Sequence, residues 1–177
     1  MMELSAQLKH QLLPIKLLVM DVDGILTNGT LSFLADGSEV KTFSILDGLG
    51  LKLLMQSGIK TAIITGRSSP QVELRAKNLG IDYTQQGRED KLEALKELWK
   101  RTGFDASNTA YIGDDLPDLS AIKTCQFGAT VPNGYWYVRQ HADWISETPG
   151  GQGAVRELCD LIMAAQGNLE AALESYL

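Results

Sequence analysis

Short apolar runs and longer amphipathic stretches alternate along this chain. The apolar runs end at loop or cap residues, which is typical of strands that are covered on both faces. They lie at 15–20, 61–65, 109–113 and 126–130. Stretches with a helical spacing of apolar positions lie at 48–56, 70–79, 90–101 and 118–123. Strands that alternate with helices predict an α/β fold with a doubly wound, Rossmann-like, mostly parallel sheet.

The last part of the chain continues this pattern in a weaker form. The residues 143–145 predict one more short strand, and segment 148–177 reads as a glycine-rich tail followed by two helices. The expected helices are 153–165 and 169–177. With 177 residues, the chain is long enough for one domain with a substantial core, so a single domain over 1–177 is expected.

The segment 29–44 interrupts the alternation of strands and helices. Its sequence, GTLSFLADGSEVKTFS, predicts two strands around Asp36 and Gly37, a pair that favours a tight hairpin turn. A hairpin after the first parallel strand has no place inside such a sheet, so we expect it to project. Its apolar side chains then need a cover, which a partner subunit or the protein's own domain can supply equally well. These side chains are Leu31, Phe33, Val40 and Phe43.

Composition and charge narrow the class of protein. Hydrophobic residues make up 44% of the chain and charged residues 21%, and the net charge of −6 is a poor match to nucleic acid. Cys125 and Cys159 lie far apart, as expected of buried thiols in a reducing compartment. The apolar run that ends at Met20 is interrupted by Pro14 and Lys16, too short and broken for a membrane span or a signal peptide. We therefore expect a cytoplasmic protein with no membrane partner and no nucleic-acid partner.

Carboxylates gather where the predicted strands end. The first strand is followed by Asp21 and Asp23, and the run 109–113 by Asp114, Asp115 and Asp118. Ligands of doubly wound sheets bind beyond the carboxyl ends of the strands, so these side chains should meet. Several carboxylates at one sheet edge repel each other unless a cation lies between them. Because no His or Cys accompanies them, the expected ion is a hard divalent cation, and Mg²⁺ fits best.

Each of these motifs is weak when it is taken alone. Asp and Gly commonly end strands, and a TGR or GDD sequence is usually only a loop. A calcium-binding EF-hand loop that starts at Asp21 fails, because Ile25 and Leu26 stand where an oxygen ligand and a glycine are needed. The order of the motifs, each after an apolar strand, carries more weight than any one of them.

Taken together, the motifs resemble those of the haloacid dehalogenase superfamily of phosphohydrolases. The matching residues are Asp21 and Asp23 in DVDG, Thr65 in IITG, Lys91, and Asp114, Asp115 and Asp118 in GDDLPD. The resemblance implies that Asp21 is the nucleophile and Asp23 the general acid and base. It implies that Thr65 and Lys91 bind the phosphoryl oxygens. Mg²⁺ would then bind the carboxylates of Asp21 and Asp114 and the backbone carbonyl of Asp23. Asp115 and Asp118 would hold these ligands in place or be weaker ligands themselves.

The spacing of the motifs leaves no room for a cap domain. Asp21 and Thr65 are 44 positions apart, which the hairpin and one helix fill, and the 26 positions from Thr65 to Lys91 hold a helix, a strand and a loop. The stretches DVDGILTNG, FSILDGLGLKLL, TGRSSPQVELRAKNLGI and GGQGAVRELCDLI resemble one capless family, the 3-deoxy-D-manno-octulosonate 8-phosphate phosphatases of lipopolysaccharide precursor biosynthesis. That resemblance implies a homotetramer and a substrate with both a phosphate and a carboxylate. The substrate-binding positions it implies, besides Asp23 and Lys91, are Ser44, Ile45, Leu46, Asp47, Gly48, Lys52, Arg67 and Arg75.

Some positions and some alternatives stay open. Asn28 stands where the family often has Asp, and Leu46 replaces a residue that is often polar or basic. A capless phosphatase for a nine-carbon, sialic-acid-type 9-phosphate would use the same motifs. A phospho-acceptor switch domain of the receiver type also places Asp, Thr and Lys at a sheet edge, but it needs no second Asp two positions after the first. A non-catalytic scaffold is a further alternative, and it would not need every catalytic position to be filled. The resemblance also implies that hairpins pack together and that a C-terminal segment with Arg156 reaches a neighbour's site.

Overall fold

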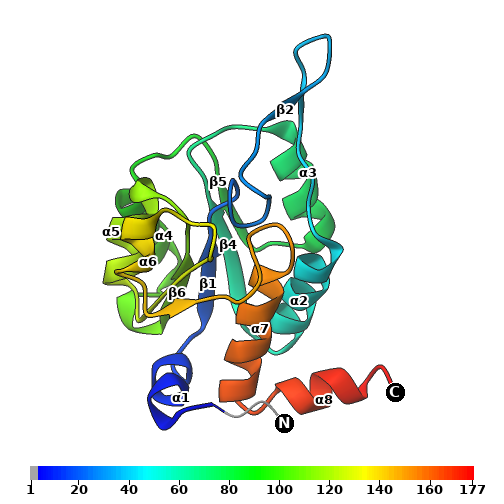
Figure 1. The fold of residues 1–177 in the computed structure, drawn as a ribbon. Helices are drawn as coiled ribbons and strands as arrows, with labels where there is room; N and C mark the ends of the chain where they lie inside the picture. The colour runs from blue at the N-terminus through cyan, green and yellow to red at the C-terminus, as the bar shows by residue number, and fades with distance from the viewer. Residues whose placement is uncertain (1–3) are drawn as a thin grey trace.

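The computed structural model describes residues 4–177 and shows a six-stranded parallel sheet between two layers of helices (Figure 1). The strand order is β5-β4-β1-β6-β7-β8, so the first strand of the chain lies in the middle of the sheet. The strands are β1 (Leu17–Met20), β4 (Lys60–Ile64), β5 (Tyr83–Gln85), β6 (Thr109–Ile112), β7 (Phe127–Thr130) and β8 (Trp144–Ile145). The predicted doubly wound α/β fold is confirmed.

Helices cover both faces of the sheet because alternate residues of β1 point to opposite sides. Leu18 and Met20 belong to a core that the helices α1, α2, α3, α7 and α8 share, whereas Leu17 and Val19 pack with α4, α5 and α6. The helices are α1 (Ala6–Leu12), α2 (Ile45–Gln56), α3 (Pro70–Leu79), α4 (Lys91–Thr102), α5 (Leu116–Thr124), α6 (Trp136–Arg139), α7 (Ala154–Ala165) and α8 (Leu169–Glu174), with one 3₁₀ turn, η1 (Ala106–Asn108). Every residue of β1, β6 and β7 is buried, as the apolar runs predicted.

The differences from the sequence prediction lie at element ends and in short elements. Helix α2 begins three residues earlier than expected because Ser44 caps it, its Oγ accepting from the backbone N of Leu46 and Asp47. The last helix ends at Glu174 instead of 177. Helices α1 and α6 were not predicted. The strand expected between Thr65 and Lys91 is present and is β5.

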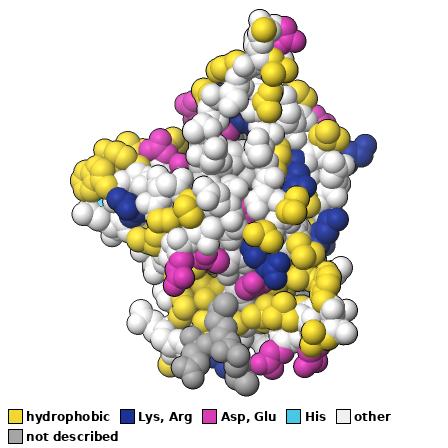
Figure 2. Space-filling view, turned by 45° about the vertical axis from the view of Figure 1, so that its right-hand side comes forward, with side chains coloured by type: hydrophobic (Ala, Val, Ile, Leu, Met, Phe, Trp, Pro, Cys, Tyr) yellow, Lys and Arg dark blue, Asp and Glu magenta, His cyan; other side chains and the backbone are white. Residues whose placement is uncertain are grey.

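The predicted hairpin is formed and projects from the end of the molecule opposite to α8 (Figure 1). Its strands β2 (Ser32–Phe33) and β3 (Glu39–Val40) pair antiparallel, and a turn at Asp36 and Gly37 joins them. Phe43 packs against the core, but Phe33 is 60% exposed, and apolar side chains line the hairpin in the space-filling view (Figure 2). Within one protomer, the apolar side chains of the projecting part therefore lack a cover; they are Leu31, Phe33, Leu34 and Val40.

No helix among residues 4–177 is long and apolar enough to span a bilayer.

Candidate active site

An open pocket of about 350 Å³ lies at the carboxyl ends of β1, β4 and β6. It collects most of the side chains that the sequence marked, although they come from distant parts of the chain. Its lining residues are Asp21, Asp23, Gly29, Thr65, Gly66, Arg67, Glu89, Lys91, Asp114, Asp115, Pro117 and Asp118. The parallel sheet brings these residues together because its strands all end at this edge.

The loop after β1 places two aspartates at the floor of the pocket. The backbone N of Asp21 donates to the Ile112 carbonyl at 3.0 Å and so extends the sheet by one residue. Gly24 then has a φ of +91°, a conformation that favours glycine, and a Cβ there would lie 2.0 Å from Asp114 Oδ2. The glycine of DVDG therefore allows the carboxylate of Asp114 to approach the loop that carries Asp21.

Lys91 is the centre of a buried charge cluster. Its Nζ lies 2.8 Å from Asp21 Oδ1 and 2.7 Å from Asp118 Oδ1, and its side chain is 4% exposed. Asp118 also accepts from Tyr111 Oη at 2.8 Å, and its other oxygen accepts from the backbone N of Asp114 and Asp115. Because all these contacts occupy Asp118, its carboxylate holds Lys91 and the loop in place and has little capacity left for a metal ion.

Burial raises the pKa of two carboxyls in the pocket. The pKa of Asp21 rises to about 6 through burial and the charge of Asp118, although Lys91 opposes the shift. The pKa of Asp114 rises to about 7 through burial and the charges of Asp118, Asp21 and Asp115. Burial alone would lower the pKa of the Lys91 ammonium, but the charges of Asp118 and Asp21 outweigh it and the pKa is raised. Lys91 therefore keeps its positive charge.

The donor set fits a divalent cation with oxygen ligands. One carboxylate oxygen from each of Asp21, Asp114 and Asp118 lies within 4.8 Å of the others. Asp21 and Asp114 are the two whose raised pKa values show that their charges lack sufficient compensation. A cation between them would relieve that repulsion, and carboxylates are the ligands that Mg²⁺ prefers.

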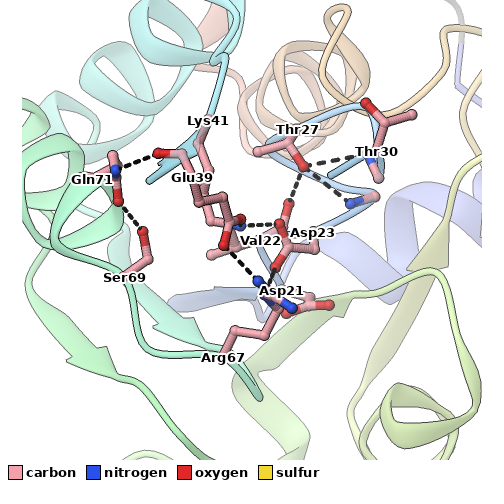
Figure 3. Close-up of polar contacts among 12 residues, drawn as sticks. Asp21, Val22, Asp23, Thr27, Thr30, Glu39, Lys41, Arg67, Ser69 and Gln71 are labelled. Carbon is pink, nitrogen blue, oxygen red and sulfur yellow. Dashed lines mark hydrogen bonds and ion pairs between the residues drawn. The ribbon is translucent and has the colours of Figure 1, made fainter. Parts of the chain in front are cut away.

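Asp23 belongs to a second charge network, which joins it to the hairpin and to Arg67 (Figure 3). Lys41 Nζ contacts Asp23 Oδ1 and lies 2.9 Å from Glu39 Oε1. Arg67 contacts the other oxygen of Glu39, and its Nε lies 3.7 Å from Asp23 Oδ2. Hydrogen bonds from Lys41 and then Arg67 lower the pKa of Glu39, which keeps its negative charge. The hairpin therefore places charged side chains against Asp23 and Arg67, two residues of the pocket lining.

The sequence prediction missed Glu39, Lys41 and Tyr111. The first two are hairpin residues whose spacing carries no chemical pattern, and Tyr111 stands inside an apolar strand where an aromatic residue is ordinary core. The signal for Lys41 is a cation directly after a hairpin strand that returns toward Asp23, and it becomes visible only when the direction of the hairpin is known.

The substrate-binding positions predicted on α2 and α3 are not part of the pocket lining within this protomer. Ser44 caps α2, and its carbonyl accepts from Arg75 at 2.9 Å. Asp47 is buried, and its Oδ1 accepts from the backbone N of Arg156 at 2.9 Å. Ile45, Leu46 and Lys52 are exposed. Gly48 lies against Arg75, because a Cβ there would be 2.4 Å from its guanidinium. Their role toward a substrate stays a prediction, whereas Arg67 does line the pocket.

The C-terminal segment supports the loop that carries Asp21. Gly151 N donates to the Ile25 carbonyl at 2.8 Å, and a Cβ on Gly150 would lie 1.7 Å from the Gly24 carbonyl oxygen. Arg156, on α7, pairs with Asp160 at 2.8 Å, so its reach to a neighbouring site stays a prediction. Since α7 packs closely on α2 and buries eight residues, this helix of segment 148–177 is part of the core.

Comparison with known proteins agrees with this geometry. The family model of haloacid dehalogenase-like hydrolases matches residues 49–126. A 3-deoxy-D-manno-octulosonate 8-phosphate phosphatase from Haemophilus influenzae is 41% identical over 160 residues, covering 90% of this chain and 89% of the relative. The enzyme of the same name from Escherichia coli K12 is 39% identical over 158 residues, covering 89% of this chain and 84% of its own.

A solved structure of the Moraxella catarrhalis enzyme of that name, in complex with magnesium, phosphate and KDO, superposes with a TM-score of 0.95. It is 50% identical in sequence and covers 97% of this chain and 98% of its own. The cobalt-bound Haemophilus influenzae enzyme superposes with a TM-score of 0.87 at 41% identity, covering 91% of this chain and 94% of its own. The chain belongs to the 3-deoxy-D-manno-octulosonate 8-phosphate phosphatase family of haloacid dehalogenase-like hydrolases.

Proposed function

We propose that the protein is a Mg²⁺-dependent phosphatase that hydrolyses 3-deoxy-D-manno-octulosonate 8-phosphate (KDO 8-phosphate) to KDO and phosphate. The observation that carries the proposal is the position of Asp21 at the end of β1, with Lys91, Asp114 and Asp23 in the same pocket. The magnesium, phosphate and KDO in the Moraxella catarrhalis structure support the choice of cofactor and substrate.

Asp21 acts as the nucleophile in this proposal. Its free oxygen attacks phosphorus, a bond forms between the carboxylate and phosphorus, and the bond from phosphorus to the sugar oxygen breaks. Asp23 gives its proton to that sugar oxygen as it leaves. In the second step Asp23 takes a proton from water, the water oxygen attacks phosphorus, and the carboxylate of Asp21 is released with inorganic phosphate.

The remaining residues hold charge in place during both steps. The Lys91 ammonium faces the Asp21 carboxylate at 2.8 Å and is held by Asp118, so it can neutralise phosphoryl oxygens without moving. Thr65 follows β4 and lines the pocket with a hydroxyl for the same group. Asp21 and Asp114 would hold Mg²⁺, which supplies positive charge against the phosphoryl group when it is bound.

The test is phosphate release by the purified protein with Mg²⁺ from three substrates. KDO 8-phosphate should be hydrolysed with a kcat/KM well above that of a nine-carbon sialic-acid-type 9-phosphate and of a simple phosphate ester. A preference for the nine-carbon acid would reassign the substrate within the same reaction. Absence of turnover on all three would support a phospho-acceptor or scaffold role and would overturn the proposal.

We also propose that the protein assembles as a homotetramer through the hairpin. The support is the exposed apolar surface of the hairpin and a pocket that is open within one protomer. A neighbouring subunit would cover the hairpin and add walls to the pocket, including the predicted positions on α2 and Arg156. The double variant Phe33→Ser with Val40→Ser should sediment as a monomer with a raised KM and an intact phosphoenzyme step. A wild-type monomer with full activity in sedimentation velocity would contradict this assembly.

A further inference from the structure

Arg67 is the accessible cation of the pocket, and a carboxylate of the protein already occupies it. Its side chain is 47% exposed, whereas Lys91, the other cation of the lining among residues 4–177, is 4% exposed. Glu39 Oε2 contacts the Arg67 guanidinium through a charge-assisted hydrogen bond. A carboxylate that enters the pocket and pairs with the same guanidinium nitrogen would therefore have to replace the side chain of Glu39.

The contacts of Glu39 allow it to release Arg67 without losing its place. Its other oxygen lies 2.9 Å from Lys41 Nζ, and the Lys41 side chain is 3% exposed. Its backbone carbonyl accepts from Gln71 Nε2 at 2.7 Å, and Ser69 Oγ donates to Gln71 Oε1 at 2.6 Å. One anchor is thus on the side chain and the other on the backbone, so neither depends on Arg67 (Figure 3).

We propose that Glu39 is a displaceable internal carboxylate that competes with the carboxylate of the sugar acid for Arg67. The inference rests on the proposed function, because substrate and product of that reaction both carry this carboxylate. The substrate also has a phosphate group, which the buried end of the pocket holds. The product has lost the phosphate and keeps mainly its contact to Arg67, so the return of Glu39 to Arg67 favours product release.

The exchange swaps one carboxylate for another on the same guanidinium, so its net free energy is small. Exposed ion pairs of this kind contribute little to stability, and the effect on affinity should be correspondingly modest. Glu39 does not touch the phosphoryl group in this scheme. Because Glu39 shares Lys41 and Arg67 with Asp23, the measurement that isolates this exchange is the affinity for KDO and not the rate of hydrolysis.

The test compares the wild type with Glu39→Gln by calorimetric titration of KDO in the presence of Mg²⁺. The variant should bind KDO roughly two- to five-fold more tightly, with a matching drop in the product-inhibition constant. The matched control is Glu73→Gln, which removes an exposed carboxylate on α3 and should leave the affinity unchanged. Equal or weaker binding by Glu39→Gln than by the wild type overturns the proposal.

A double variant separates competition for Arg67 from an indirect effect on the hairpin. In an Arg67→Gln background, Glu39→Gln should no longer change the affinity for KDO, because the guanidinium they compete for is gone. A tightening that persists in that background overturns the proposal. A wild-type protein that does not hydrolyse KDO 8-phosphate overturns the proposed function as well, whereas normal hydrolysis with unchanged product affinity in Glu39→Gln overturns this inference alone.

Discussion

Two charge networks flank the aspartates of the DVDG loop, and they differ in burial. The network behind Asp21 joins Lys91, Asp118 and Tyr111 in a nearly solvent-free position, with each polar atom held by a strand or helix. The network in front of Asp23 comes largely from the hairpin and is more exposed, although its members range from 3% at Lys41 to 47% at Arg67. Both pair acids with bases, but only the first is enclosed by the core.

The difference in burial suits the two networks to different parts of a substrate. Charges that meet the phosphoryl group gain most when they are fixed in a low-dielectric setting, which suits the enclosed network. Charges that meet the rest of the substrate must let it enter and leave, which suits a network exposed to water. The comparison can be tested by removing one member at a time.

The largest expected effect comes from the nucleophile itself. Asp21→Asn should lower phosphate release more than about a thousandfold, because an amide oxygen is a poor nucleophile toward phosphorus. Circular dichroism should show that the variant is folded. The matched control, Asp105→Asn, changes a carboxylate that caps η1 and should retain activity. Activity above about a tenth of wild type in Asp21→Asn would contradict the assignment.

The next effect concerns the contribution of the enclosed network to stability. Lys91→Met should lower the free energy of unfolding by about 3–5 kcal/mol, because it leaves the carboxylates of Asp21 and Asp118 buried without their cation. Lys96→Met removes a lysine from the same helix whose partner, Glu93, is exposed, and should cost less than about 1 kcal/mol. Urea unfolding measures both. Equal costs would show that burial does not raise the cost of removing a paired lysine.

Metal-free stability should depend on pH through Asp114. Its pKa is raised to about 7, so the folded chain holds a proton that the unfolded chain releases, and the folded state loses stability as pH rises from about 4 to 7. In chelator, Asp114→Asn should therefore raise the free energy of unfolding by on the order of 2 kcal/mol more at about pH 8 than at about pH 5.

At about pH 8, added Mg²⁺ should make the wild type more stable than Asp114→Asn. The ion stabilises the wild type by binding it, and the variant offers the ion one carboxylate fewer. Urea unfolding at both pH values, with and without the ion, provides the measurement. A variant that is less stable than the wild type in chelator at about pH 8 would show that the Asp114 charge is already compensated by the protein.

The smallest expected effect lies in the exposed network. Arg67→Gln should raise KM for KDO 8-phosphate by roughly three- to ten-fold, while kcat for a simple phosphate ester stays near wild type, because the guanidinium meets the carboxylate and not the phosphoryl group. Steady-state kinetics on both substrates gives the result. Arg101→Gln, at the end of α4, is the control. An equal loss on both substrates would place Arg67 at the reacting phosphate instead.

The sequence was sufficient for the enclosed network except Tyr111, and it was insufficient for the hairpin residues of the second network. Asp21, Thr65 and Asp114 follow apolar runs, and parallel strands bring such positions to one edge whatever the loops do. Glu39 and Lys41 reach Asp23 only because the hairpin folds back over the first loop, and no periodicity encodes that direction. Short helices were also missed, namely α1, in which only Leu12 is buried, and α6, in which only Val138 is buried, since they bury too few residues to leave a pattern.

The close approach of Gly150 to Gly24 also bears on the order in which the protein is made. Asp21 and Gly151 are 130 residues apart, yet the loop that carries Asp21 rests on the loop that contains Gly151. At a synthesis rate of about 5–20 residues per second, roughly 7 to 26 s pass between the synthesis of Asp21 and that of Gly151. For the first 91 of these 130 residues β1 also lacks its neighbour β6, so a nascent chain exposes an apolar strand that ends in two acids. The DVDG loop is among the first parts of this chain to be synthesised and among the last to be completed.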